Sequence, residues 1–233
     1  MWKQVIEIAN ESNLLTYKIY KKMNKVSSGN DYVHGVTAPL TSQFLHEPIG
    51  QIMQNIQAKK VLDIGCGNGH LAKYLKINII HSDGVIVGMD PSESGIENAQ
   101  LLLPDAKFYC MGVYDNPCKI EENNFDAVVS TEVVEHLFYP RELLRFAKAK
   151  LKPGGYILLT TPYHGYLKNL VLSIFNKWDN HHWALWDGGH IKFWSKKTLS
   201  DLLNVEGFEF KEFVGCGRVP YLWKSMLLVG KLR

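Results

Sequence analysis

The chain has 233 residues, of which 46% are hydrophobic and 21% charged, and its formal net charge is +3. This length and composition suit one domain with a large core, and the small net charge does not favour a nucleic acid as partner. The four cysteines at positions 66, 110, 118 and 216 show no C-x-x-C pairing, which excludes a disulfide framework and favours a reducing compartment.

The N-terminal region, residues 1–57, has the pattern of helices interrupted by a loop, SSGNDYVHG. Acidic residues interrupt its first apolar stretch, so it is not expected to be a signal peptide. No apolar run reaches the roughly 20 residues that span a bilayer. These features predict a cytoplasmic protein with a helical N-terminal cap. We expect Tyr32 and His34, in the loop, to close over a bound ligand.

Residues 58–163 alternate strand-like apolar runs with amphipathic segments. The runs with strand character, bounded by Gly, Pro, Asn or Asp, are residues 60–65, 85–90, 107–112, 125–130 and 155–161. The segments with helical periodicity between them are residues 69–77, 92–103 and 140–151. This alternation predicts β-α-β units, which form a doubly wound α/β fold with helices on both faces of a parallel sheet.

The segment VLDIGCGNGH connects the first predicted strand to the first helix. Gly65, Gly67 and Gly69 allow a tight turn whose backbone can approach a ligand closely. Their G-x-G-x-G spacing differs from the G-x-G-x-x-G of a dinucleotide site, and His70 follows the third glycine. Asp63 precedes the turn, where a carboxylate repels a pyrophosphate and attracts a cation. The loop therefore favours a nucleoside with an ammonium and a sulfonium group over NAD.

Asp90 ends the second predicted strand, 21 residues after Gly69. An acid at this position can accept hydrogen bonds from both ribose hydroxyls of a nucleotide. The alternative is a turn-forming Asp before Pro91, but the glycine turn that precedes it favours the ribose contact.

The motifs VLDIGCGNG, GMD, FDAVVS and LKPGGYILLTTP resemble, in order and spacing, those of class I S-adenosylmethionine-dependent methyltransferases. The resemblance spans about residues 55–163 and continues through GGHIKFWSKKTLSDLLNVEGFE. It implies a Rossmann-like, three-layer α/β/α fold whose seven-stranded sheet is mostly parallel, with one antiparallel strand in the terminal hairpin. It also implies S-adenosylmethionine as cofactor and S-adenosylhomocysteine as product, bound across the carboxyl ends of the first strands.

The same resemblance implies a set of cofactor contacts. The residues expected in it are Asp63, Gly65, Cys66, Gly67, Gly69, Asp90, Pro91, Gly112, Val113, Tyr114, Ser130, Thr131 and Glu132. Cys66 and the glycines beside it would surround the methionine part, and Asp90 would hold the ribose. The adenine region departs from the family pattern, because Val113 stands where many members have an Asp. Asp115, or the backbone of Val113 and Tyr114, is expected to replace that contact.

Two glutamates and a histidine, Glu132, Glu135 and His136, follow the strand FDAVVS. In a helical turn they would share one face, and such a set can hold a divalent cation such as Mg²⁺, Mn²⁺ or Zn²⁺. A metal would make a substrate hydroxyl a better nucleophile for the sulfonium methyl. The E-x-x-E-H pattern resembles two metal-assisted branches, the ubiquinone-pathway O-methyltransferases and the small-RNA terminal 2′-O-methyltransferases. Their fourth ligand is a later histidine, which His190 matches here.

A metal-free site is the alternative to this metal set. In that case a glutamate closes the cofactor pocket, and His136 or His190 acts as the general base for the acceptor hydroxyl. Both alternatives make Glu135, His136 and His190 the catalytic candidates.

Residues 164–190 form an insertion rich in tryptophan and histidine. Aromatic residues beside the active edge predict a lid over an apolar or aromatic small-molecule substrate, although a small core that anchors the insertion is the alternative. The segment YLKNLVLSIFNKW has an apolar helical stripe, which we expect to pack over the pocket; peripheral contact with a membrane is the second interpretation. Residues 191–233 are expected to add a helix that ends at Gly207 and two strands, at residues 208–216 and 221–232.

The sequence therefore predicts a single domain, residues 1–233, that methylates a hydroxyl of a small hydroxylated or aromatic acceptor. An RNA 3′-terminal 2′-O-methyltransferase shares the acidic and histidine residues but needs a basic groove, which the net charge does not indicate. An NAD-dependent oxidoreductase is disfavoured by Asp63 and His70. A non-catalytic cofactor-binding protein is disfavoured by the intact set of acids and histidines.

Overall fold

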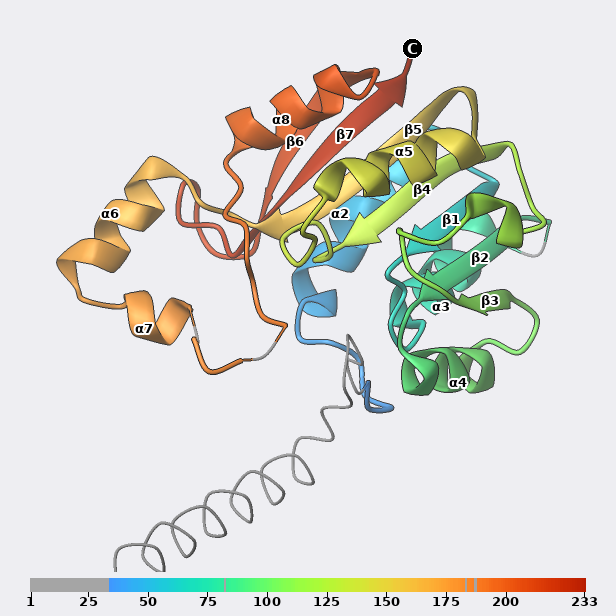
Figure 1. The fold of residues 1–233 in the computed structure, drawn as a ribbon, viewed down its shortest axis with the longest axis horizontal. Helices are drawn as coiled ribbons and strands as arrows, with labels where there is room; N and C mark the ends of the chain where they lie inside the picture. Colours follow the sequence, from blue (N-terminus) through green and yellow to red (C-terminus); the bar gives the residue numbers. More distant parts are fainter. Residues whose placement is uncertain (1–33, 82, 183, 187) are drawn as a thin grey trace, which may run out of the picture.

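A computed structural model describes residues 34–81, 83–182, 184–186 and 188–233. Its strands are β1 (Lys60–Ile64), β2 (Val85–Asp90), β3 (Lys107–Cys110), β4 (Phe125–Thr131), β5 (Leu151–Pro162), β6 (Phe208–Cys216) and β7 (Ser225–Leu232). They form one seven-stranded sheet in the order β3-β2-β1-β4-β5-β7-β6 (Figure 1). All neighbouring pairs are parallel except those of β7, which is antiparallel to β5 and to β6. The expected sheet with one antiparallel strand in its terminal hairpin is confirmed.

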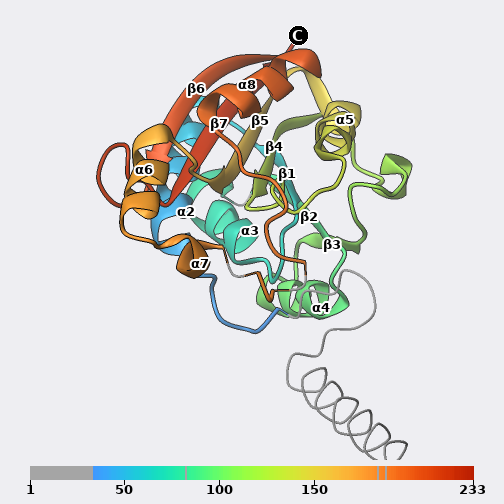
Figure 2. The ribbon, with the colours of Figure 1, turned by 60° about the vertical axis from the view of Figure 1, so that its left-hand side comes forward.

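Helices cover both faces of this sheet (Figure 2). The helices of the described residues are α2 (Ser42–Asn55), α3 (His70–Leu75), α4 (Glu93–Leu102), α5 (Pro140–Lys150), α6 (Tyr166–Ile174), α7 (Trp178–His181) and α8 (Lys196–Val205), with a π-helical turn η1 (Lys76–Ile80) and a 3-10 turn η2 (Pro117–Lys119). Because successive side chains of a strand point to opposite faces, the strands divide their apolar residues between two cores. Val61 and Leu158 pack with α2 and α3, whereas Leu62 and Leu159 pack with α5 and α8. The three-layer architecture is confirmed.

Element boundaries differ from the sequence-based expectations most clearly at three places. The helix that begins with α3 continues through η1 to Ile80. Strand β5 begins at Leu151, ahead of the expected residue 155. The last strand begins at Ser225 and not at residue 221, because the chain turns at Arg218 and Tyr221, whose φ angles are +62° and +64°. Within the expected N-terminal cap, α2 is present; residues 1–33, which include Tyr32, lie outside the described residues.

α6 and α7 project from the side of the sheet toward which β4 points (Figure 1). The apolar stripe of α6 is exposed, with Leu167 45%, Ile174 66% and Phe175 65% accessible, and the residue that α6 buries is Lys168. The expectation that this stripe packs over the pocket is therefore wrong, because α6 contacts the domain through the face that carries Lys168. No helix in the described ranges combines the length and the apolarity of a membrane span.

Candidate functional site

The loop between β1 and α3 is a tight turn at the carboxyl edge of the sheet. The N–H groups of Gly65 and Cys66 both donate to the Met89 carbonyl, at 2.8 and 3.0 Å. Gly65, Gly67 and Gly69 have φ angles of +77°, +50° and +78°, in the left-handed region that glycine enters without steric cost. The Cys66 side chain is buried, which raises the pKa of its thiol well above the usual range. The predicted glycine turn is confirmed.

Gly65 also lies against the segment that carries Glu135. A Cβ atom at Gly65 would meet Val133 Cγ2 at 2.3 Å, whereas one at Gly154, with a similar φ of +72°, would have Lys231 Cε at 3.7 Å as its nearest neighbour. We expect Gly154→Ala to lower the free energy of unfolding by about 1–2 kcal/mol, the cost of the left-handed backbone. Gly65→Ala should lose about 1–3 kcal/mol more through the clash. Urea unfolding followed by circular dichroism measures both values.

The double variant Gly65→Ala/Val133→Ala serves as the control for this clash. Its free energy of unfolding should regain the part that Gly65→Ala loses to the clash, but not the part lost to the left-handed backbone. Equal losses for Gly65→Ala and Gly154→Ala would contradict this contact between the glycine turn and Val133.

Asp63 is completely buried in β1, just before the glycine turn. Neither of its carboxylate oxygens has a hydrogen-bond partner within the described part of the chain. Burial, reinforced by the nearby charge of Asp90, raises the pKa of Asp63 to about 8. A nearby cation favours the ionised form of such a group and offsets its desolvation. A buried acid of this kind can pair with the ammonium group of a methionine-bearing nucleoside, and this contact stays a prediction.

Asp90 shapes the glycine turn from the end of β2. Its Oδ2 accepts a hydrogen bond from Gly67 N–H at 2.9 Å, and its Oδ1 accepts one from Ser92 N–H at 2.9 Å. Asp90 therefore does hold the turn around Pro91, which was the alternative to a ribose contact. Each carboxylate oxygen can accept a second hydrogen bond, so the ribose contact of Asp90 stays a prediction.

Residues 34–37 cover the glycine turn. The side-chain amide of Asn68 donates to the carbonyls of Gly35 and Thr37, at 2.7 and 2.8 Å. The ring of His34 lies over Gly67, where an added Cβ would approach it to 2.9 Å, and its Nε2 is 3.9 Å from Asp90 Oδ1. The contact of this segment with the glycine turn is thus observed, whereas its closure over a ligand stays a prediction.

The side chain of Asp115 makes its contacts within the loop that follows β3. Asp115 Oδ2 accepts a hydrogen bond from Gly112 N–H at 3.0 Å, and Oδ1 pairs with Lys119. Its carboxylate therefore holds the loop closed, which favours the backbone of Val113 and Tyr114 as the adenine contact. Val113 is buried, whereas Tyr114 is 52% exposed and accepts a hydrogen bond from Tyr139 N–H.

The end of β4 places Ser130 and Glu132 in different environments. The Ser130 hydroxyl donates to the Ile64 carbonyl at 2.8 Å and so ties β4 to β1. Glu132, just after the last strand residue Thr131, has a φ angle of +54°. Its Oε1 accepts from the Thr160 hydroxyl at 2.9 Å and its Oε2 from the Ser225 hydroxyl at 3.2 Å. Burial raises the pKa of Glu132 to about 7.

The expected helical turn over residues 132–137 is wrong. The segment is a single turn closed by a hydrogen bond from His136 N–H to the Val133 carbonyl, at 3.0 Å. The positive φ of Glu132 interrupts a right-handed helical path, so the Glu132 carboxylate turns toward β5 and β7. It does not share a face with Glu135 and His136.

Glu135, His136 and His190 do come together, and we call them the Glu135 cluster. One ligand atom from each lies within 4.8 Å of the other two. Nε2 of His136 and Nε2 of His190 are 4.0 and 3.9 Å from Glu135 Oε1. The backbone brings His190 to this place, because the N–H groups of Ile191 and Lys192 both donate to the Glu135 carbonyl at 3.0 Å. Three of the four predicted metal ligands thus meet, and Glu132 lies outside the group.

The Glu135 cluster is a buried acid beside imidazoles that burial keeps neutral. Glu135 is 1% exposed, and neither oxygen of its carboxylate has a hydrogen-bond partner within the described ranges. Burial, and then the charge of Glu132, raises the pKa of Glu135 well above its usual range. Burial lowers the pKa of His190 to about 4 and also lowers that of His136, whose Nδ1 is 2.8 Å from the Gly188 carbonyl.

These properties decide what the Glu135 cluster fits. An uncompensated buried carboxylate with two neutral imidazoles is a donor set for a divalent transition-metal ion or Zn²⁺. A histidine with a pKa of about 4 is a poor general base near neutral pH, since a general base works best with a pKa near the operating pH. Metal binding by the Glu135 cluster stays a prediction, as does the metal-free alternative.

The hydroxyl groups that hold Glu132 are not among the residues that the sequence predicts for the site. Thr160 and Thr161 are buried at the end of β5, and Ser225 is buried at the start of β7. The available signal was the pair of threonines that ends the apolar run GYILLTT. Buried hydroxyls need partners, so a pair in a central strand indicates a polar neighbour.

Comparisons with known proteins agree with this architecture. A family model described as a methyltransferase domain matches residues 38–212. The chain is 28% identical over 212 residues to the human mitochondrial ubiquinone biosynthesis O-methyltransferase, covering 80% of this chain and 54% of that protein. It is 28% identical over 141 residues to the ubiquinone biosynthesis O-methyltransferase of Hydrogenovibrio crunogenus, covering 59% of this chain and 54% of that protein. The chain thus spans about half the length of these curated relatives.

A solved structure shows the same fold. The magnesium protoporphyrin IX methyltransferase of Synechocystis PCC 6803, with bound SAH, has a TM-score of 0.58 and 16% sequence identity. The similarity covers 81% of this chain and 82% of that one.

Proposed function

Because the chain belongs to the methyltransferase-domain family, we propose that it transfers the methyl group of S-adenosylmethionine to a hydroxyl oxygen of a small hydroxylated or aromatic acceptor. The observation that carries this proposal is a pair of buried, uncompensated carboxylates at one edge of the sheet. Asp63 lies beside the glycine turn, and Glu135 lies beside two histidines. The glycine turn and the Glu135 segment are in contact through Gly65 and Val133.

The cofactor end of the site is the region around the glycine turn. Asp63 would balance the ammonium group, and the turn from Gly65 to Gly69 would let the backbone approach the methionine part. Asp90 would accept hydrogen bonds from the ribose, and the backbone of Val113 would contact the adenine. S-adenosylhomocysteine would be held by the same groups, because it differs by one methyl and by the sulfur charge.

The acceptor end of the site is the Glu135 cluster, which would hold a divalent metal. A metal ion bound there supplies Lewis acidity toward a hydroxyl oxygen. Glu135 would provide its negative charge, and His136 and His190 would provide neutral nitrogen ligands. Glu132, held by Thr160 and Ser225, would close the pocket between the two ends. The acceptor hydroxyl would release its proton to solvent water, and its oxygen would form the O–CH₃ bond as the S–CH₃ bond breaks, leaving S-adenosylhomocysteine. These groups must therefore mainly hold the oxygen in line with the methyl.

Aromatic residues beside the Glu135 cluster support an aromatic acceptor. The ring centroid of Trp186 lies 5.6 Å from that of His136 and 5.5 Å from that of His190. The two curated relatives are named as O-methyltransferases of ubiquinone biosynthesis. We infer a phenol or catechol as the acceptor class.

Calorimetry tests the cofactor assignment directly. S-adenosylhomocysteine should bind with one site per chain, because Asp63 and the glycine turn need no acceptor to be in place. NAD at the same concentration should give no heat of binding, because its pyrophosphate would approach the Asp63 carboxylate. Binding of NAD alone would refute the proposal.

A screen with labelled S-adenosylmethionine tests the acceptor class. Catechols and phenolic quinone precursors should become labelled in the presence of Mn²⁺ or Mg²⁺. Short RNAs form the comparison arm, and labelling of RNA alone would replace the small-molecule acceptor with a 3′-terminal ribose.

A further inference from the structure

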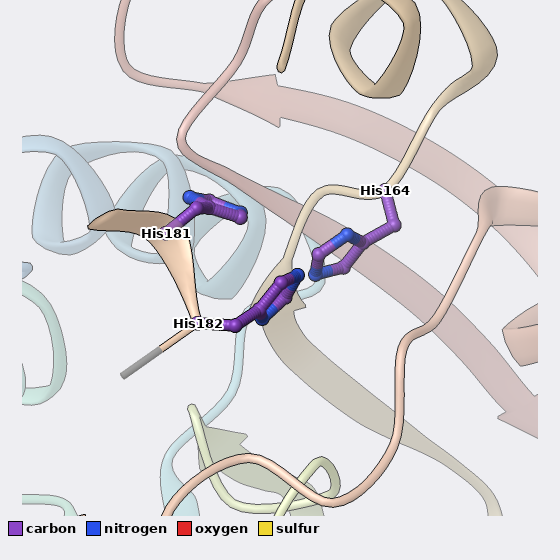
Figure 3. A group of neighbouring side chains, drawn as sticks. All are labelled: His164, His181 and His182. Carbon is purple, nitrogen blue, oxygen red and sulfur yellow. The ribbon is translucent and has the colours of Figure 1, made fainter. Parts of the chain in front are cut away.

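A second group of histidines lies outside the residues assigned above. His164 follows the end of β5, whereas His181 and His182 lie at the end of α7. The three ring centroids are 5.5 Å apart for His164 and His181, 5.4 Å for His164 and His182, and 4.8 Å for His181 and His182. In Figure 3 the rings of His164 and His182 point toward each other, and the ring of His181 lies beside them. We propose that this three-histidine cluster is a zinc site, separate from the Glu135 cluster.

The spacing of the nitrogens carries the proposal. One nitrogen from each ring lies within 4.8 Å of the other two. Zn–N bonds of about 2.1 Å in tetrahedral geometry place the ligand nitrogens roughly 3.4 Å apart. Side-chain rotations that move the ring nitrogens by roughly an ångström would therefore bring them to zinc-binding distances.

The surroundings show groups that lack partners. His182 Nε2 is buried and has no hydrogen-bond partner within the described part of the chain, and the same holds for Asn169 Oδ1. Asn169 lies beside His164, and its side chain partly offsets the lowering of the pKa of His164 by burial. An amide oxygen beside a ligand histidine can orient the ring and define its tautomer.

The chemistry of the donors selects the ion. Burial lowers the pKa of His164 and of His181 to about 4, so both rings are neutral near pH 7 and available as ligands. Among the residues that the structure describes, no carboxylate belongs to the cluster. Imidazole ligands suit zinc, whereas Mg²⁺, Ca²⁺ and Mn²⁺ prefer oxygen ligands. Three histidines leave a fourth position for water or another ligand.

Two cations oppose an ion at this place. Lys168 lowers the pKa of all three histidines, and Arg218 adds to this effect at His181. Burial lowers the pKa of Lys168 itself to about 8. Removal of this positive charge by Lys168→Met should therefore tighten zinc binding.

Zinc at this cluster would attach α7 to the end of β5. The ring of Phe193 lies 4.3 Å from that of His182 and 5.1 Å from that of His164. Because Phe193 follows His190 closely in the chain, the ion would also brace the segment that delivers His190 to the Glu135 cluster.

The test isolates this cluster by working with the Glu135→Ala variant, which disables the other metal group. After chelator treatment, Co²⁺ absorption and Zn²⁺ calorimetry on Glu135→Ala should show one equivalent bound. Adding His181→Ala or His182→Ala should weaken zinc by roughly 100-fold or more, beyond the 10–100-fold typical of losing an outer-shell partner. The exposed His81→Ala substitution is the matched control and should leave the affinity unchanged.

A circular dichroism spectrum that matches the wild type shows that each variant is folded. If His182→Ala does not fold, His181→Ala decides the result. Absence of zinc binding by Glu135→Ala at micromolar concentration, or unchanged affinity after loss of His181 or His182, would overturn the proposal. None of these outcomes depends on methyl transfer, so they are separate from the test of the proposed function.

Discussion

Replacement of Glu135 by alanine is expected to slow methyl transfer by about 10²–10⁴-fold, with little change in the affinity for S-adenosylhomocysteine. The Glu135 carboxylate is the acid of the Glu135 cluster, so its loss should prevent metal binding. Lewis-acid stabilisation by a metal lowers the barrier by several kcal/mol, and about 1.4 kcal/mol corresponds to a factor of ten in rate. Cofactor binding should survive because Asp63 and the glycine turn are untouched. Labelled-methyl assays and calorimetry measure the two effects.

A matched control and an independent readout make this prediction specific. Glu142→Ala removes an acid that is partly exposed on α5 and paired with Arg145, and it should retain activity. Binding of Mn²⁺, followed by electron paramagnetic resonance, should be lost in Glu135→Ala and kept in Glu142→Ala. Full activity of the wild-type protein in excess chelator would rule out the metal-assisted mechanism.

Replacement of Asp63 by asparagine is expected to act in opposite directions on binding and on stability. The loss of a charge-assisted contact with the ammonium group should weaken S-adenosylhomocysteine by roughly 30–100-fold, since hydrogen bonds to charged groups are worth about 1.5–3 kcal/mol. The free protein should become more stable, because Asp63 is buried without a partner. Calorimetry and thermal unfolding check the two parts.

The pH dependence of this gain follows from the shifted pKa. Asp63 has a pKa of about 8 in the folded protein, against its ordinary value of 3.8. A raised folded-state pKa means that the wild type loses stability as pH rises from 3.8 to about 8. Asparagine does not titrate, so the gain of Asp63→Asn should be small near pH 4 and largest above pH 8.

The size of the gain has an upper limit set by linkage. Each pKa unit corresponds to about 1.4 kcal/mol, so a shift from 3.8 to about 8 limits the gain to about 6 kcal/mol. The asparagine amide is also buried, so we expect about 2 kcal/mol at pH 8, or roughly 4–8 °C in Tm. The exposed Asp105→Asn variant should show neither effect. A Tm difference independent of pH would show that Asp63 is not a buried, unpaired acid.

The local sequence determined the sheet core and the glycine turn. Alternation of apolar runs with helical segments predicted β1 to β5, because strand and helix periods are properties of neighbouring residues. The turn at Gly65 to Gly69 was also predictable, since the positive φ angles there need glycine. Asp63 could be identified as an acid next to this turn for the same reason.

Tertiary structure alone decided which acids and histidines meet. Glu132 was expected beside Glu135, but its positive φ and the hydroxyls of Thr160 and Ser225 direct it elsewhere. His190 reaches Glu135 through backbone hydrogen bonds across more than fifty residues, and His164 meets α7 across the insertion. Side-chain direction at such places depends on backbone angles and long-range contacts, which no local periodicity contains.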